Sequence, residues 1–327
     1  MKILSFLLKR SFYSLCLLTV VVILNFFLLQ MAPGSIVDTI AGEMGGISEK
    51  MKVELEQEYG LDKPVVIQLG HYLKKAAHGD LGYSFYIKKD VVNVLWERFP
   101  ATALLFILSV VISTVLGTIL GNLASIKPDG LFSAAVTTFS LAAHSAPAFW
   151  LGILLLLCFG IWIPIFPVSG MISMKLTAEG GTFWEYTKDI TMHLILPLTT
   201  LSLIYLAHYS RLARASMLEV LKTDYIRTAR AKGLPEHTII FKHALRNALL
   251  PVITATGIRL GQVFSGAVVV EAVFGWPGLG QLAFQSVLRR DYPVVMGILI
   301  FATLIVIVAN MLTDLAYRII DPRIRTS

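Results

Sequence analysis

Six stretches of mostly apolar residues run along this 327-residue chain, separated by segments rich in polar and charged residues. A helix needs about 20 apolar residues to cross a hydrocarbon layer of roughly 30 Å. The pattern therefore predicts six membrane-spanning helices, at residues 12–29, 101–123, 131–166, 192–209, 249–273 and 294–319.

Two of these stretches need comment. Unbroken, 131–166 would be about 54 Å long, so we expect one spanning helix with a kink or break near Pro147, whose ring lacks a backbone N–H. The stretch 12–29 follows basic residues and could also be a cleavable signal peptide. Its length and the poor cleavage site at 31–33 favour an uncleaved helix.

Composition agrees with a membrane protein. Hydrophobic residues make up 56% of the chain and charged residues 15%, whereas soluble domains are about 25% charged. A secreted, nucleic-acid-binding or purely cytosolic protein is therefore excluded. Cys16 and Cys158 both lie in apolar stretches, so they form neither a disulfide framework nor a zinc site.

The net charge of +7 is unevenly distributed along the chain. Fifteen basic and five acidic residues lie in one set of segments, namely the N-terminus, 124–130, 210–248 and the C-terminus. Twelve basic and fourteen acidic residues lie in the opposite set, namely 32–100, 167–191 and 275–293. Cytoplasmic segments of membrane proteins are enriched in Lys and Arg. We expect both termini in the cytoplasm, and the charge indicates membrane topology rather than a nucleic-acid partner.

Three parts follow from this organisation. Residues 1–31 form an N-terminal transmembrane helix, 32–100 a small extracytoplasmic segment, and 101–327 the transmembrane domain. The fold class is all-α.

A cytoplasmic helix-turn-helix is predicted at about 210–250. Its first helix places Leu218, Leu221, Tyr225 and Ala229 on one face. Gly233 stands where a helix C-cap belongs, Leu234 and Pro235 make the turn, and a second helix starts at Glu236.

No catalytic motif is present. The chain has no glycine-rich phosphate loop, no His-Glu-x-x-His helix and no Gly-x-Ser-x-Gly elbow, and its seven histidines show no metal-ligand spacing. We predict no catalytic residue, no bound metal and no cofactor on this chain.

A few polar residues within the spans are candidates for a translocation pathway. A buried charge in a membrane is costly and usually faces a cavity or a partner. His144, Arg259 and Glu271 are the candidates; Arg259 could instead form a structural ion pair with Glu271 or Asp314. Arg259 also lies between Gly257 and Gly261, a spacing that favours close helix packing.

Several motifs resemble those of one family. The segment 224–234 (DYIRTARAKGL), followed by 243–251 (HALRNALLP), resembles the cytoplasmic loop of ABC importer permeases of the dipeptide/oligopeptide/nickel branch. Four further stretches fit in the family's order: 32–34 (APG), 79–82 (GDLG), 271–280 (EAVFGWPGLG) and 321–325 (DPRIR).

This resemblance implies a subunit that does not hydrolyse ATP itself. It would lie in a bacterial inner membrane, pair with a second permease, and bind two ATPase subunits below and an extracytoplasmic solute-binding protein above; ATP would bind the partners. The loop would couple to the ATPase, with Leu234 as its apolar contact. The residues that the resemblance assigns to coupling are Asp224, Arg227, Thr228, Ala229, Arg230, Lys232, Gly233, Leu234 and Pro235. Arg227 replaces the superfamily's usual glutamate, which leaves in doubt the salt bridge that the glutamate would make.

The cargo stays open at this point. Peptides are the commonest substrates of the branch, and nickel or a metallophore is the alternative. An ion-coupled secondary transporter would need inverted repeats and several acidic groups inside the spans, and only Glu271 and Asp314 approach this. A membrane-embedded enzyme has no visible polar constellation to support it.

Overall fold

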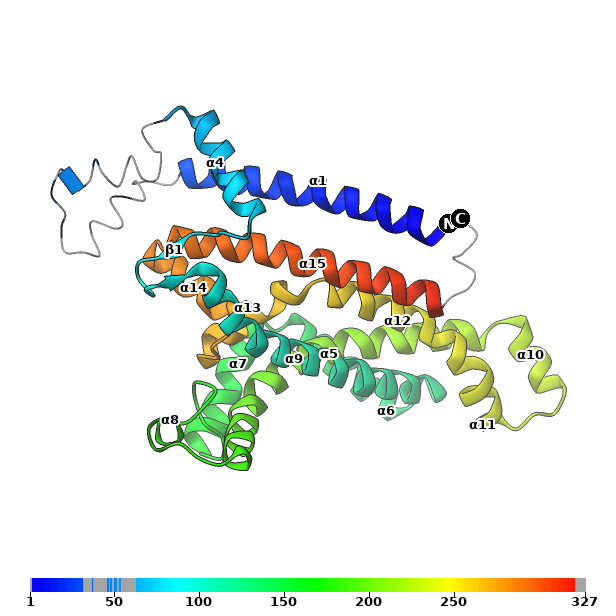
Figure 1. The fold of residues 1–327 in the computed structure, drawn as a ribbon. Helices are drawn as coiled ribbons and strands as arrows, with labels where there is room; N and C mark the ends of the chain where they lie inside the picture. The colour runs from blue at the N-terminus through cyan, green and yellow to red at the C-terminus, as the bar shows by residue number, and fades with distance from the viewer. Residues whose placement is uncertain are drawn as a thin grey trace. The chain divides into compact units, whose positions relative to one another are not determined.

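The computed structural model describes residues 2–31, single positions between 37 and 53, and residues 63–320. The predicted motifs at 32–34 and 321–325 and most of segment 32–62 lie outside the described residues. The described chain is mostly helical, as its apolar stretches predict (Figure 1). It divides into two compact units, 1–100 with 278–311, and 101–277 with 312–327.

The first unit combines the N-terminal part of the chain with residues 278–311. Its elements are α1 (Lys2–Met31), α4 (Val65–Ala77), β1 (Tyr83–Ser84), β2 (Lys89–Asp90), the start of α5 (Val91–Ile126), α14 (Leu279–Arg289) and most of α15 (Tyr292–Ile320). α4 packs on α1, where the Phe26 and Tyr72 ring centroids lie 5.8 Å apart. Gln30 Nε2 donates to Gln68 Oε1 at 2.7 Å beside this contact.

The Gly-Asp-Leu-Gly motif turns the chain from α4 into the antiparallel hairpin of β1 and β2. Gly79 and Gly82 both have positive φ, and the Gly82 N–H donates to Asp80 Oδ1 at 2.9 Å. From the hairpin, Ser84 Oγ donates to Asp291 Oδ2 at 2.5 Å. Burial raises the pKa of the Asp291 carboxyl, against the effect of the Ser84 hydrogen bond. The motif therefore sets the hairpin against the start of α15.

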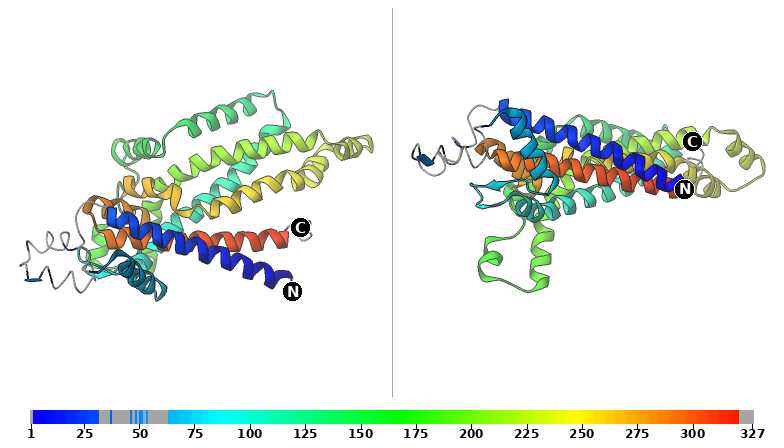
Figure 2. Two further views of the ribbon diagram at one scale, coloured as in Figure 1. Left: turned by 90° about the horizontal axis from the view of Figure 1, so that it is seen from above. Right: turned by 45° about the horizontal axis from the view of Figure 1, so that its top comes forward.

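The second unit is a bundle around one long helix. Besides the rest of α5, its elements are α6 (Leu131–Ser145), α7 (Ala148–Leu156), the π-helical segment η1 (Leu157–Trp162), α8 (Met174–Glu179), α9 (Phe183–Leu221), α10 (Asp224–Ala231), α11 (Glu236–Thr238), the π-helical segment η2 (Ile239–Ala244), α12 (Leu245–Leu260) and α13 (Val263–Phe274). α9 packs against α6, α7, α12 and α13, and both views of Figure 2 show α12 beside it.

α9 extends well beyond the predicted span 192–209. Thr182 and Glu185 form a capping box at its start, since each side chain accepts from the other residue's backbone N–H. Its 39 residues correspond to about 58 Å at 1.5 Å per residue. α9 can therefore cross a bilayer and still carry a segment clear of it.

The breaks between helices agree only in part with the sequence. The predicted break near Pro147 is confirmed, because α6 and α7 meet at an angle of 103°. The prediction of one helix over 249–273 is wrong: α12 ends at Leu260 and α13 begins at Val263, because Gln262 leaves helical geometry (φ −104°, ψ 30°). Four helices in the described residues are long and apolar enough to span a membrane, or six if two bent helix pairs each count as one.

Two glycines of α5 allow its backbone to approach α9. A Cβ on Gly117 would lie 2.7 Å from the Tyr209 Cβ, and one on Gly121 would lie 2.9 Å from the Ala213 Cβ and collide with the Ser210 backbone oxygen. This Gly-x-x-x-Gly spacing is typical of close helix packing in membranes. The same spacing also occurs in the sequence at Gly257 and Gly261.

We expect Gly121→Ala to destabilise the second unit, because the added methyl group meets backbone atoms that cannot rotate away. The loss should be on the order of 1–3 kcal/mol, measured as a lower midpoint of thermal unfolding of the purified protein in detergent.

Gly70→Ala in α4 is the matched control. A Cβ there has no atom within 4 Å, so we expect an unchanged or slightly higher midpoint. Equal midpoints for the two variants would refute the close approach of α5 and α9.

Candidate coupling site and membrane pathway

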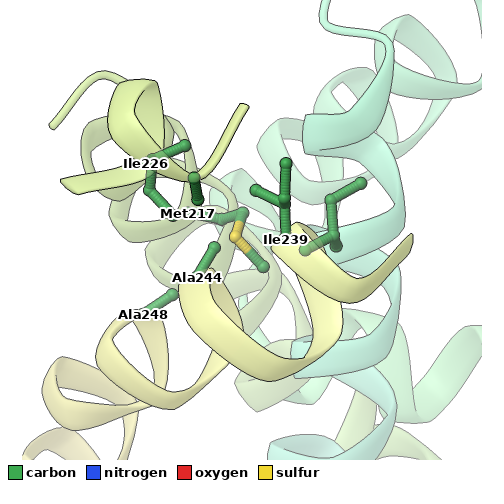
Figure 3. Close-up of a cluster of buried hydrophobic side chains, with 7 residues drawn as sticks. Met217, Ile226, Ile239, Ala244 and Ala248 are labelled. Atoms are coloured by element: carbon green, nitrogen blue, oxygen red, sulfur yellow. The ribbon is translucent and has the colours of Figure 1, made fainter. Parts of the chain in front are cut away.

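The loop between α9 and α12 folds around a small apolar core. α9 ends at Leu221 and α10 begins at Asp224, so the predicted continuous face through Leu218, Leu221, Tyr225 and Ala229 is wrong. Two helices at different angles share that sequence. Figure 3 shows the core, which consists of Met217, Ile226, Ala229, Ile239, Ile240, Ala244 and Ala248.

The predicted turn at Gly233 is confirmed in detail. Gly233 has φ +75°, its N–H donates to the Arg230 carbonyl, and the Leu234 N–H donates to the Ala229 carbonyl. These two bonds form a Schellman motif, which ends α10. Pro235 then takes an extended conformation (φ −65°, ψ 141°), from which α11 starts. Open space surrounds the α-carbon of Gly233, so glycine is required there by its dihedral angle and not by crowding.

Charged side chains brace the turn from outside. Arg230 Nη2 donates to Glu236 Oε1 at 2.6 Å and so joins α10 to α11. This hydrogen bond lowers the pKa of the Glu236 carboxyl below its usual value. Arg227 pairs with Asp224 within α10. All four side chains are exposed, so each pair contributes little stability and mainly fixes orientation.

The exposed surface of the loop carries apolar side chains as well as charges. The exposed fractions of Leu234, Tyr225 and Phe241 are 38%, 42% and 59%. Tyr225 Oη accepts a hydrogen bond from Asn247 Nδ2 at 2.7 Å, which fixes its ring against α12. The sequence did not indicate that Tyr225 and Phe241 lie on the surface; for Tyr225, the available signal was its position inside the short polar segment 224–232.

The predicted coupling residues fall into different positions. Ala229 lies in the core at 8% exposure, and the Thr228 hydroxyl donates back to the Asp224 carbonyl of its own helix. Gly233 and Pro235 shape the turn. Leu234, Arg227 and Lys232 remain on the surface.

Glu271 lies among buried contacts between α13 and α5 rather than on an open surface. Its side chain is fully buried, and its Oε1 accepts from Thr102 Oγ1 at 2.7 Å. The backbone then turns at Gly275 (φ +58°), and Trp276 Nε1 donates to the Ala101 carbonyl at 2.9 Å. These contacts hold the end of α13 to α5.

Arg259 and His144 lie elsewhere in the second unit. The Arg259 guanidinium carbon is 4.6 Å from the centroid of the Tyr205 ring, and the residue is half-buried. The ion pair with Glu271, the structural alternative for Arg259, is not formed. The Asp314 side chain lies outside the described part of the chain. His144 is exposed in the last turn of α6.

Family models account for almost the whole chain. Residues 113–326 match the "Binding-protein-dependent transport system inner membrane component" model, and residues 3–106 match the model of its N-terminal part. The chain belongs to this family. It is a multi-pass inner membrane protein, and permeases of this kind are not themselves catalytic. The resemblance to ABC importer permeases of the peptide branch is confirmed.

Named relatives cover the permease nearly end to end. It is 39% identical over 321 residues to the di/tripeptide transport system permease protein DppB of Pseudomonas aeruginosa, with 93% of this chain and 94% of the relative covered. It is 39% identical over 341 residues to the dipeptide transport system permease protein DppB of Escherichia coli K12, with 98% and 99% covered. A chain of an amino acid ABC transporter solved with histidines aligns with a TM-score of 0.49 and 17% identity, covering 69% of the permease and 94% of that chain.

We expect Trp276→Phe to lower the free energy of unfolding by about 1–3 kcal/mol, because it leaves the buried Ala101 carbonyl without this donor. Thermal unfolding followed by helical circular dichroism avoids any change in tryptophan emission. Trp184→Phe is the control, since Trp184 is 76% exposed. An unchanged midpoint for Trp276→Phe would show that the hydrogen bond from Trp276 to the Ala101 carbonyl contributes no stability.

Proposed function

We propose that the permease forms half of the translocation path of an ATP-driven importer for di- or oligopeptides. The observation that carries this proposal is the 39% identity to a dipeptide permease over 98% of the chain. A family member of this kind works with a second permease, ATPase subunits and an extracytoplasmic binding protein. ATP hydrolysis belongs to the separate ATPase subunits, so this chain carries no cofactor.

The proposed topology has six spans, with both termini and the α9–α12 loop in the cytoplasm and segment 32–100 outside. The excess of basic residues in the cytoplasmic set supports this orientation. The length of α9 supports a loop clear of the membrane, because the helix exceeds a bilayer core of roughly 30 Å by several turns.

The α9–α12 loop is the proposed contact with the ATPase. Figure 1 shows α10 and α11 beyond the ends of α9 and α12, where a cytoplasmic subunit can reach them. Leu234 and Tyr225 offer apolar contacts, and Arg227 and Lys232 surround them with positive charge. An apolar centre with a charged rim is the usual composition of a protein interface.

Coupling follows from the rigidity of the loop. Its buried core, the Schellman turn and the Arg230–Glu236 pair make α10 and α11 one body with the ends of α9 and α12. Closure of the ATPase dimer on ATP would move this body and the attached helices between outward and inward access. Such a two-state element links two distant sites.

Purification of the tagged complex tests the proposed function. We expect two ATPases and a second permease to co-purify, and the complex with its binding protein to take up a labelled dipeptide into liposomes only with ATP. Uptake of a nickel chelate without peptide uptake would show that the cargo is a metal complex and not a peptide. Uptake by the isolated chain, driven by an ion gradient, would show an ion-coupled secondary transporter instead of an ATP-driven importer.

We expect Leu234→Asp to reduce both the recovered ATPase and peptide uptake by about tenfold or more, because a carboxylate would be desolvated in the contact. The control is Met174→Asp, which changes an even more exposed apolar side chain (92% exposed) in the first turn of α8. Normal ATPase recovery with Leu234→Asp would exclude Leu234 from the contact.

A further inference from the structure

Arg259 carries a charge that its surroundings do not neutralise. It lies in the last turn of α12, within the apolar stretch 249–273. In the described part of the chain its guanidinium makes no hydrogen bond and no ion pair, and its recorded partner is the face of the Tyr205 ring. A cation–π contact contributes roughly 0.5–2 kcal/mol, which is less than the cost of a cation at the centre of a bilayer. Arg259 therefore requires a further polar partner.

Other positive or protonatable groups gather around Arg259. Tyr205, His208 and Arg211 follow one another at intervals of three residues on α9. Arg259, Arg211 and His144 all lie within electrostatic range of the His208 imidazole. No carboxylate of the described residues forms an ion pair with Arg259 or Arg211, so these two guanidinium groups favour an anion nearby.

Hydroxyl groups along the same helix add hydrogen-bonding capacity. Ser202 is 6% exposed and Tyr209 is fully buried, and neither hydroxyl has a hydrogen-bond partner among the described residues. They flank Tyr205 by three and four residues, so they belong to the same stretch of α9. Buried polar groups normally have partners, so both hydroxyls keep unused hydrogen-bonding capacity within the described part of the chain.

We propose that Arg259 binds the terminal carboxylate of a peptide in transit. The Tyr205 ring positions the guanidinium, and His208 lies nearby on the same helix as Tyr205. This inference rests on the proposed function. The contact with the Tyr205 ring leaves the guanidinium N–H groups without a hydrogen-bond partner among the described residues. Those groups match the two oxygens of a carboxylate in a bidentate pair. Every peptide with a free C-terminus carries this group, so the site would recognise peptides as a class and not the side chains of a particular peptide.

The test measures equilibrium binding of one labelled dipeptide and of its C-terminal amide to the purified permease–ATPase complex without the binding protein. We expect the wild-type complex to bind the carboxylate form at least about tenfold more tightly than the amide, the ratio expected for one charge-assisted pair. Arg259→Gln should remove this preference by weakening the carboxylate form alone. Arg259→Lys, which keeps the charge but not the bidentate geometry, should fall between them.

Arg289→Gln is the matched control. Arg289 stacks on the Tyr86 ring at 4.1 Å, in the same kind of contact but in the first unit. We expect it to keep the wild-type preference. Co-purification of the ATPases with every variant confirms that the complexes are assembled.

Two results would overturn the inference. One is equal binding of the carboxylate form by wild type and Arg259→Gln, including no binding by either. The other is an equal loss of both ligands in Arg259→Gln, which assigns Arg259 to structure or to a contact with the second permease. Uptake by the wild-type complex separates these failures from failure of the proposed function. If the wild type takes up the dipeptide, only the carboxylate site is wrong; if it takes up no peptide, both proposals fall.

Discussion

A hydrocarbon layer offers no hydrogen bonds, so every break in a helix of this permease needs a partner for its backbone within the protein. The end of α13 shows how this is met. Gly275 reverses the chain with a positive φ, the Gly170 N–H donates to the Phe274 carbonyl, and Trp276 donates from its indole to α5. The buried Glu271 carboxylate receives the Thr102 hydroxyl beside them. The hydrogen bonds at this turn account for Gly275 and Trp276 of the Phe-Gly-Trp-Pro-Gly segment.

Close packing with paired polar groups also allows α9 to transmit movement between the loop and the bundle. Gly117 and Gly121 bring the α5 backbone against it, and Ser140 and Ser210 share a buried hydrogen bond of 2.6 Å between α6 and α9. These contacts hold residues 209–213 of α9 firmly against its neighbours, so a movement at the loop end of α9 is passed on to the bundle. Interfaces of this kind move as rigid bodies between discrete arrangements.

The sequence predicted those features that depend on a single residue's backbone chemistry. Pro147 predicted the break between α6 and α7, and Gly233 with Pro235 predicted the turn after α10. It failed where tertiary contact decides. Apolar residues dominate on both sides of Gly261 and Gln262, so hydropathy predicted one helix where the dihedral angles give two. Helical periodicity likewise ran through Lys222 and Thr223, where the chain leaves α9, and so assigned Tyr225 to the wrong surface. The partner of Arg259 could not be read from spacing, because Tyr205 lies on another helix.

The two proposed sites lie on the same pair of helices. The loop joins α9 to α12, and the Arg259–Tyr205 contact bridges α9 to α12 further along. Tyr205 lies 16 residues before the end of α9 and Arg259 lies 14 residues after the start of α12, which corresponds to roughly 24 Å and 21 Å of helix. A change in angle between these helices at the loop therefore changes the distance between Arg259 and Tyr205 directly. A carboxylate bound there would favour one arrangement of the pair, and by linkage the ATPase would be sensitive to its presence.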